Sequence, residues 1–377
     1  MSESLGWSRT VLTGALALRV LTAASLAPLF GFVVDRYGPR FLMVASAVIG
    51  GVAALLLSRV SEIWQFYAIF AFVGISGGAG LGGVVTGATV SKWFVRLRGR
   101  ALAFTTMGGP APGLVLAPVI AFVVFTYGWQ AGWILMSVLF IVLLLPVSLL
   151  MARQPEDMGL LPDGAKSEDE VKEAYGRRAG LESQYSWRLG EALRTRTLWL
   201  LVLTQILSGL AVSSVVLHEF SYVKQLGYST AVAAGVLSTH SGLAMAFRPV
   251  WGLMLERVPV RFAMSAVYLG TGGALLILLN ASSILMVFLF AAVYGTSVAG
   301  LAVSQAIIFP NYFGRDNVGT IRGFIMPLSM PAGALGPFLV SVAFDTKGTY
   351  FMAFTVLMFL MLVSAVIMLL VKPPVRR

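Results

Sequence analysis

The chain has 377 residues, of which 58% are hydrophobic and 11% are charged, and its formal net charge is +11. Soluble domains contain roughly 45–50% apolar and about 25% charged residues, so this composition argues against a soluble enzyme and is typical of a membrane protein. The chain has no cysteine, which rules out disulfides and a thiolate nucleophile, and two histidines leave little for a metal site. We therefore expect no enzymatic activity, no bound metal and no cofactor.

Eleven apolar segments are long enough to cross a bilayer core, which requires about 20 residues per helix. In chain order they lie at 10–34, 41–58, 63–91, 101–126, 130–152, 197–222, 229–255, 262–280, 282–312, 319–343 and 349–371. We predict an all-α polytopic membrane protein with eleven transmembrane helices, five before a polar stretch at 153–196 and six after it.

The connections between these segments alternate in charge. The basic connections are 35–40, 92–100, 153–196, 256–261, 315–322 and the tail 372–377. They carry 21 of the 27 Lys and Arg residues, four others lie on the opposite side, and Arg19 and Arg248 lie within spans. The positive-inside rule places the basic side in the cytoplasm, with the amino terminus outside and the carboxyl terminus inside. The same rule explains the positive charge without a nucleic-acid partner.

The polar stretch 153–196 divides the chain into two related halves. We interpret it as a cytoplasmic linker between an N-terminal bundle at 1–152 and a C-terminal bundle at 197–377. Two sets of residues share the same spacings at an offset of 221, namely Pro28, Gly31, Asp35 and Arg40, and Pro249, Gly252, Glu256 and Arg261. Arg98-Gly99 and Arg322-Gly323 repeat at an offset of 224. The halves thus share one plan, and the first half lacks its opening helix.

Four segments resemble motifs of the major facilitator superfamily of secondary transporters. Residues 31–40 (GFVVDRYGPR) are similar to its cytoplasmic loop motif, and 108–113 (GGPAPG) to a Gly-Pro motif of its fifth helix. Residues 155–164 (PEDMGLLPDG) resemble the linker after helix six in the bacterial monocarboxylate and oxalate/formate branch of this superfamily. Residues 6–10 (GWSRT) resemble the start of helix two in the same branch. This resemblance covers essentially the whole chain and implies two six-helix halves related by an axis along the membrane normal.

The resemblance also implies a cytoplasmic gate formed by the loop motif and its repeat. The matching residues are Gly31, Asp35, Arg36, Gly38, Arg40, Gly252, Glu256, Arg257 and Arg261. An acid that ends a helix near the interface can pair with basic residues, and Gly38 allows a tight turn. Because the family has twelve helices and the chain matches from helix two onward, we expect the first helix to be missing. A groove would remain opposite 197–222, and either the native gene starts upstream or the product is impaired.

Arg248 is the main candidate for substrate binding. An arginine in the bilayer core is costly unless it faces a cavity or a partner. Arg248 lies eight residues before Glu256, which places it roughly 12 Å inward from the cytoplasmic end of the helix. Ser241 shares its helical face, and 248–252 resembles the Arg-Pro-x-x-Gly of the same branch, whose arginine helps to bind the substrate carboxylate. Arg19 is a second candidate, closer to the outer side. Either arginine could instead be structural, Arg248 by locking two helices and Arg19 by reaching the outer interface.

Glu219 and His218 are candidates for a coupling proton, since burial raises the affinity of a carboxylic acid for its proton. Their place near the outer end of 197–222 also fits an interfacial ion pair, and we interpret His240 as a hydrogen-bonded packing histidine. The glycines 74, 78 and 82, spaced by four, indicate close helix packing. The absence of Lys and Arg between 324 and 344 favours a substrate with one carboxylate.

Three hypotheses of function follow. The first is a secondary transporter that moves a small organic anion, in particular a monocarboxylate, by alternating access, with proton coupling as an option. The second is an exporter of drug-like or cationic compounds anchored by Glu219, against which Arg248 argues. The third is a truncated member that no longer transports. The expected partners are the small anion and the lipid bilayer of the bacterial inner membrane, and we expect a monomer.

The predicted topology can be tested by labelling single cysteines, because the chain has none of its own. Ser2→Cys is expected to react with a membrane-impermeant maleimide added to intact cells, whereas Val375→Cys is expected to react only after the cells are permeabilised. Reaction of Ser2→Cys from the cytoplasmic side alone would show that the topology is inverted.

Overall fold

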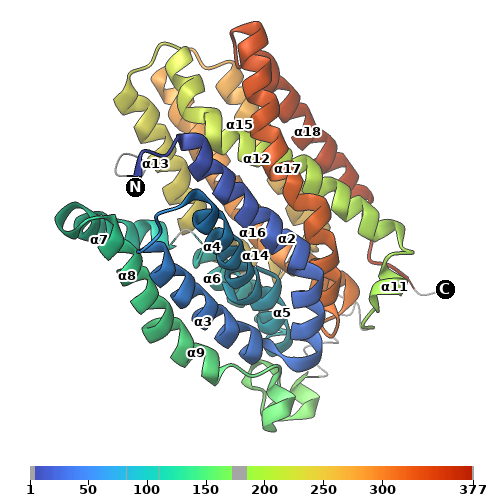
Figure 1. Ribbon diagram of the computed structural model, residues 1–377. Helices are drawn as coiled ribbons and strands as arrows, with labels where there is room; N and C mark the ends of the chain where they lie inside the picture. Colours follow the sequence, from blue (N-terminus) through green and yellow to red (C-terminus); the bar gives the residue numbers. More distant parts are fainter. Residues whose placement is uncertain (1–4, 82, 110, 172–184, 376–377) are drawn as a thin grey trace. The chain divides into compact units, whose positions relative to one another are not determined.

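The computed structural model describes residues 5–81, 83–109, 111–171 and 185–375. All regular secondary structure in these residues is helical, and the chain divides into two compact units (Figure 1). Unit 1 comprises residues 1–95, 108–174 and 315–327, and unit 2 comprises 96–107, 175–314 and 328–377. The predicted all-α fold is confirmed, whereas the topology and its external Ser2, which lies outside the described residues, stay predictions.

Unit 1 is built from long apolar helices with two π-helical segments. Its helical elements are α2 (Arg9–Tyr37), α3 (Pro39–Leu57), α4 (Ile63–Ser76), η1 (Gly77–Leu81), α5 (Gly83–Trp93), α7 (Ala111–Tyr127), α8 (Trp129–Leu139), η2 (Phe140–Leu144), α9 (Leu145–Leu150), η3 (Pro155–Met158) and η4 (Pro162–Gly164). Helix α4 packs between α2 and α3, and α8 lies against α3 (Figure 1). The first turns of the polar stretch 153–196, η3 and η4, therefore belong to this unit.

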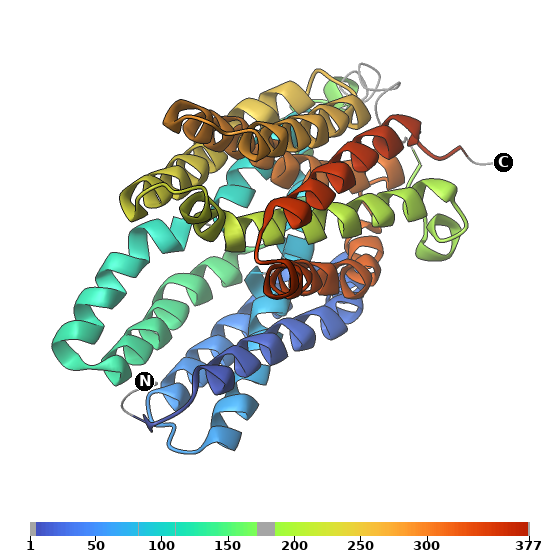
Figure 2. The same ribbon diagram turned by 90° about the horizontal axis from the view of Figure 1, so that it is seen from above.

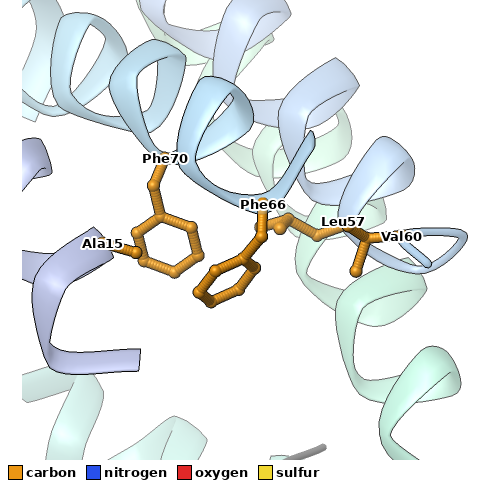
Figure 3. Close-up of a cluster of buried hydrophobic side chains, with 5 residues drawn as sticks. All are labelled: Ala15, Leu57, Val60, Phe66 and Phe70. Carbon is orange, nitrogen blue, oxygen red and sulfur yellow. The ribbon is translucent and has the colours of Figure 1, made fainter. Parts of the chain in front are cut away.

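An apolar cluster joins α2, α3 and α4 (Figure 3). It consists of Ala15, Leu57, Val60, Phe66 and Phe70, each at most 7% exposed. The rings of Phe66 and Phe70 lie one turn apart on α4, with their centroids 4.5 Å from each other. Full burial of one such side chain contributes about 1.5–3 kcal/mol. The cluster therefore holds the turn between α3 and α4 against the first part of α2.

Unit 2 contains the helices of the second half together with α6. Its elements are α6 (Arg98–Met107), α11 (Leu189–Ala192), α12 (Arg196–Gln225), α13 (Thr230–Ala246), α14 (Arg248–Leu255), α15 (Val260–Leu279), α16 (Ile284–Phe313) and α18 (Phe351–Leu370). Helix α15 packs on both α16 and α18, and α12 runs along α18 (Figure 2). Helix α17 (Val318–Lys347) begins in unit 1 and continues in unit 2.

Ten helical segments of the described residues are long and apolar enough to cross a membrane. The span predicted at 101–126 forms two helices instead, α6 and α7, of 10 and 17 residues. The sequence Gly108-Gly109-Pro110 separates them, and glycine and proline both disfavour a helix interior. The predicted count of eleven uninterrupted spans is therefore not confirmed. Large apolar side chains on the spans are exposed, such as Leu217 of α12 at 64%, as lipid contact requires.

Glycines mark the places where helices approach most closely. A Cβ atom at Gly74 would lie 2.5 Å from the carbonyl oxygen of Arg19, and one at Gly78 would lie 2.8 Å from the ring of Phe30. The predicted helix packing at these two positions is confirmed, and Gly82 lies outside the described residues. Two further close approaches join the first half of the sequence to the second. A Cβ at Gly319 would lie 2.9 Å from the oxygen of Gly31, and one at Gly252 would lie 2.7 Å from that of Gly99.

We expect Gly252→Ala to lower the thermal stability of the purified protein. The added methyl group would meet the backbone of Gly99, and overpacking of this kind costs typically about 1–3 kcal/mol. Gly273→Ala is the matched control, because Gly273 lies in the same unit, in α15, with nothing within 4 Å of its Cβ position. Differential scanning fluorimetry in detergent measures both. Equal melting temperatures for the two variants would contradict this account of the contact.

Candidate functional site

Asp35, in the last turn of α2, holds the start of α17. Its Oδ1 accepts a hydrogen bond from the backbone N–H of Gly319 (3.2 Å), and its Oδ2 accepts from the N–H of Thr320 (2.6 Å) and from its hydroxyl (2.8 Å). The ammonium of Lys92 lies 3.2 Å from the same carboxylate. A negative charge at a helix N-terminus satisfies free backbone donors and the helix dipole. Asp35 therefore joins α2, α5 and α17 in unit 1.

Glu256 has the equivalent position in unit 2. It follows α14, and its Oε1 accepts from the backbone N–H of Arg100 (3.0 Å) and from Nε of Arg100 (3.2 Å), at the start of α6. The predicted repeat thus has a physical meaning, because each acid caps a helix from the other half of the sequence. By this packing Gly99 corresponds to Gly319, at an offset of 220, and the predicted match of Gly99 with Gly323 is one turn out of register.

The remaining gate-motif residues make contacts away from these two caps. Gly38 has φ +85°, a left-handed conformation that favours glycine, and it allows α3 to begin directly after α2. Nε of Arg40 donates to the oxygen of Met151 (3.1 Å), and the guanidinium of Arg36 lies over the rings of Phe32 and Tyr37. In the second copy of the motif, Cζ of Arg261 lies 4.6 Å from the centroid of the Phe262 ring, and Arg257 is exposed.

Two basic residues of the predicted loop 92–100 are buried helix residues. Lys92 lies near the end of α5, and its Nζ also donates to the backbone carbonyl oxygen of Asp35 (3.3 Å). Arg98 begins α6, is 2% exposed, and donates from Nη1 to Oδ1 of Asn311 on α16 (3.0 Å). The sequence analysis assigns both residues to the connection 92–100, whereas in the structure both lie in helices and are buried. Their burial depends on partners far away in the sequence, which charge counting does not reveal.

Arg248 is the first residue of α14, directly after the interruption at Phe247 that separates α14 from α13. Pro249 lacks an N–H group, which favours this break. The side chain is half-buried, and its Nη1 donates to the carbonyl oxygen of Thr106, in the last turn of α6. Its Nε is buried without a hydrogen-bond partner, and no carboxylate among the described residues pairs with it. The guanidinium is thus held at one corner and retains free donors.

The two other predicted substrate residues are exposed. Arg19 lies in α2 of unit 1, and within the described part of the chain its side chain forms no hydrogen bond or ion pair. Ser241 lies in α13 of unit 2, before the interruption at Phe247. Roles for Arg19 and Ser241 in substrate binding stay predictions.

Arg322 is a partly buried arginine that the predicted topology assigns to the connection 315–322. Helix α17 begins at Val318, so Arg322 lies in its second turn. The guanidinium points at α5, where the missing side chains of Gly83 and Gly87 leave room for it, and its Nη1 is buried without a partner in the described residues. Glycines spaced by four, such as Gly83 and Gly87, are typical of close helix packing, but here the group that approaches them is the guanidinium of Arg322.

A small polar cavity lies in unit 2 among α12, α16 and α17. Its volume is about 280 Å³, and it is lined by Gln205, Gly209, Gln305, Ser329, Met330 and Gly333. The amide of Gln305 lies 3.5 Å from the hydroxyl of Ser208, next to the buried Tyr268. Gln205 and Ser208 stand out from the sequence as polar residues on one face of α12, whereas Gln305 on α16 gave no signal of its own.

Glu219 and His240 form a buried pair in unit 2. The distance from Nδ1 of His240 to Oε1 of Glu219 is 2.9 Å, and the two residues are 4% and 0% exposed. His240 is hydrogen-bonded, as predicted, but its partner is an acid. His218 points elsewhere, with Nε2 3.1 Å from the oxygen of Pro337 on α17. The partner of Glu219 is therefore a buried histidine of the same unit, and the predicted place of Glu219 at the membrane interface stays a prediction.

The Major Facilitator Superfamily model matches residues 1–337 of the chain. The chain is 24% identical to the oxalate:formate antiporter of Oxalobacter formigenes over 89% of this chain and 77% of that protein. It is 22% identical to monocarboxylate transporter 2 of Rattus norvegicus over 93% of this chain and 71% of that protein. An uncharacterized transporter of Bacillus subtilis, YcxA, is 26% identical over 41% of this chain and 38% of its own length.

Solved structures share the fold. The human organic anion transporter MFSD10 has a TM-score of 0.69 and 19% identity over 97% of this chain and 87% of that one. The E. coli fucose:proton symporter FucP has a TM-score of 0.72 and 11% identity over 98% of this chain and 92% of that one. Together with the membrane-spanning helices, these matches identify a multi-pass membrane transporter of small molecules and not an enzyme.

We expect Asp35→Asn to destabilise the protein strongly. The amide keeps the shape of the side chain but removes its charge, and it leaves the ammonium of Lys92 buried without a counter-ion. Breaking a buried pair in this way costs typically about 3–5 kcal/mol. Thermal unfolding in detergent measures the loss.

Asp157→Asn is the matched control for this substitution. Asp157 pairs with Arg153 at 2.9 Å, but both side chains are about one-third exposed, and such pairs contribute about 0–1 kcal/mol. The hydrogen bond from Arg153 holds the pKa of Asp157 below its usual value, so the pair is formed at neutral pH. A loss of stability no greater for Asp35→Asn than for Asp157→Asn would contradict the role given to Asp35.

Proposed function

Because the chain belongs to the Major Facilitator Superfamily, we propose that it is a secondary transporter for a small organic anion with one carboxylate, and that Arg248 binds this carboxylate. The observation that carries the proposal is the state of the Arg248 side chain. It lies within a membrane-spanning segment, Thr230–Leu255, where an uncompensated charge is costly. No acid among the described residues compensates it, so an anionic ligand would.

The geometry of Arg248 suits a carboxylate. One Nη donates to the carbonyl of Thr106, which orients the guanidinium plane, and Nε is left without a partner. A guanidinium presents parallel N–H donors that match the two oxygens of a carboxylate, and it stays charged at every physiological pH. A contact with a neutral helix carbonyl leaves this positive charge in place. The hydrogen bond to Thr106 therefore acts as an anchor and does not take the place of a counter-ion.

The names of two relatives support the substrate class. The oxalate:formate antiporter and monocarboxylate transporter 2 carry carboxylates by name, and both align with most of this chain. The polar cavity at Gln205 and Gln305, in the same unit as Arg248, supplies amide groups that could bind the rest of a small polar anion. A substrate with a single carboxylate fits the chain best, because one half-buried arginine of unit 2 is available to it.

The two acid caps are proposed to close the cytoplasmic side. Asp35 joins α2 to α17, and Glu256 joins α14 to α6, so each contact links a segment before 153–196 to one after it. Alternating access requires such contacts to form and break together as the bundles at 1–152 and 197–377 move. Hydrogen bonds from charged groups to helix ends suit this purpose, because water satisfies both partners when they separate.

The alternative of a cation exporter anchored by Glu219 has less support. In the structure the carboxylate of Glu219 is fully buried and already bonded to His240. A cationic substrate would have to displace that contact and would also experience repulsion from Arg248 in the same unit.

Arg248→Lys is expected to impair uptake of radiolabelled formate or lactate into proteoliposomes while expression stays normal. Lysine keeps the charge but loses the planar fork, and the loss of a charged hydrogen bond of about 1.5–3 kcal/mol corresponds to a roughly ten- to hundredfold higher KM. Arg59→Lys, an exposed site outside the spans, is the matched control. Full uptake by the Arg248→Lys variant would mean that Arg248 is structural, and uptake of a cationic dye instead of either anion would support the exporter.

A further inference from the structure

The pair formed by Glu219 and His240 lies outside the proposed substrate contacts. Glu219 is in α12 and His240 is in α13, and both helices belong to membrane-spanning segments. The carboxylate is 0% exposed and the imidazole 4% exposed. Because Glu219 is shielded completely, His240 is the member of the pair that remains in contact with the surface of the protein.

The surroundings of the pair contain no counter-charge. Within the described residues Glu219 makes no contact with Lys or Arg, and its second oxygen, Oε2, has no hydrogen-bond partner. Tyr294 of α16 packs edge-on against His240, with the ring centroids 4.8 Å apart, and its hydroxyl is also buried without a partner. A buried structural pair normally has its polar atoms satisfied, so the two open positions need another explanation.

Close packing brings α16 against the backbone of His240. A Cβ atom at Gly295, next to Tyr294, would lie 2.5 Å from the carbonyl oxygen of His240, so the backbone of α16 lies directly against α13 at this point. Other ionisable groups face away. His218 on α12 contacts Pro337, Tyr222 on α12 packs on Phe354, and α18 carries no ionisable side chain.

The charge of the pair depends on how many protons it holds. With one proton on the imidazole and none on the carboxylate, the pair has a charge of −1. With a second proton, on either the imidazole or the carboxylate, it is neutral overall. A net charge buried without compensation is costly in a protein interior and more so in a membrane, so the neutral state is favoured while the site is closed.

We propose that Glu219 and His240 form a binding site for one proton that is carried together with the substrate anion. The proton comes from water, and a new N–H bond forms at the imidazole while the carboxylate accepts its hydrogen bond through Oε1. On release the same N–H bond breaks and the proton returns to water on the other side. Proton transport by this pair rests on the proposed transport function, whereas proton binding does not.

Proton binding can be measured without any substrate, because the chain has only two histidines. The full-length protein, with ¹⁵N-labelled imidazoles, is placed in lipid bilayers, and the nitrogen shifts are followed by solid-state NMR as the pH changes. Spectra of His218→Gln identify the signal of His240. We expect the His240 signal to report a proton shared with a carboxylate, and we expect Glu219→Gln to shift the titration of that signal. A titration of His240 that is the same with and without Glu219 would overturn the proposed site.

Transport provides the second test. In proteoliposomes with an imposed pH gradient, formate or lactate uptake by the wild-type protein is expected to rise above the level without a gradient. Glu219→Gln is expected to lose this stimulation but to keep exchange of labelled for unlabelled anion at equal pH. Tyr222→Phe, which changes another buried group of α12, is expected to keep both.

These outcomes separate the two proposals. Stimulation by the gradient that survives in Glu219→Gln would overturn proton coupling by this pair, even if anion transport is intact. Absence of all anion transport in the wild-type protein would overturn the proposed function, and the NMR titration would still decide whether the pair binds a proton. Loss of both exchange and stimulation in Tyr222→Phe would show that the readout follows packing of α12 and would count against the site.

Discussion

The buried carboxylate of Asp35 is the interaction on which unit 1 depends. It satisfies the free N–H groups at the start of α17 and neutralises Lys92, and so it fixes where two helices end and a third begins. Glycines bring the backbones close enough for this contact, because a side chain at Gly31 or Gly319 would separate α2 from α17. Glu256, Gly252 and Gly99 repeat the arrangement in unit 2. Each unit thus contains the same combination of an acid at a helix end and a pair of closely packed glycines.

The same requirement for compensation distinguishes the other buried charges. Arg98 has a neutral amide partner on α16, and Lys92 has a carboxylate, so both are at least partly satisfied by the protein. Arg248 and Arg322 retain buried donors without partners in the described residues. An unsatisfied buried donor costs typically about 1–3 kcal/mol, and more when it is charged. Lys92 and Arg98 thus differ from Arg248 and Arg322 in how far the described residues satisfy their donors.

Much of the fold could be predicted from the sequence, and less of the site. The apolar segments and the repeat of Gly31 and Asp35 are local patterns, and they indicated the spans and the equivalence of the two caps. The break between α6 and α7 was missed because apolar residues continue on both sides of Gly108. Glu219 and His240 lie in two separate apolar segments of the sequence. A helical wheel describes one helix at a time, so it does not reveal their contact, which depends on how α12 packs on α13. Arg322 falls both in the predicted connection 315–322 and in the predicted span 319–343, so charge counting did not reveal that it lies inside α17.

The arrangement of charges along α13 and α14 bears on how an anion and a proton could move together. His240 and Arg248 lie eight residues apart on one membrane-spanning segment, interrupted at Phe247. An interior-negative potential opposes the entry of one negative charge by about 2.3 kcal/mol per 100 mV, which corresponds to a roughly 40-fold gradient. A monocarboxylate that crosses with one proton carries no net charge and avoids this opposition. Placing the anion contact and the proton contact on one segment lets a single movement of that segment expose or bury both.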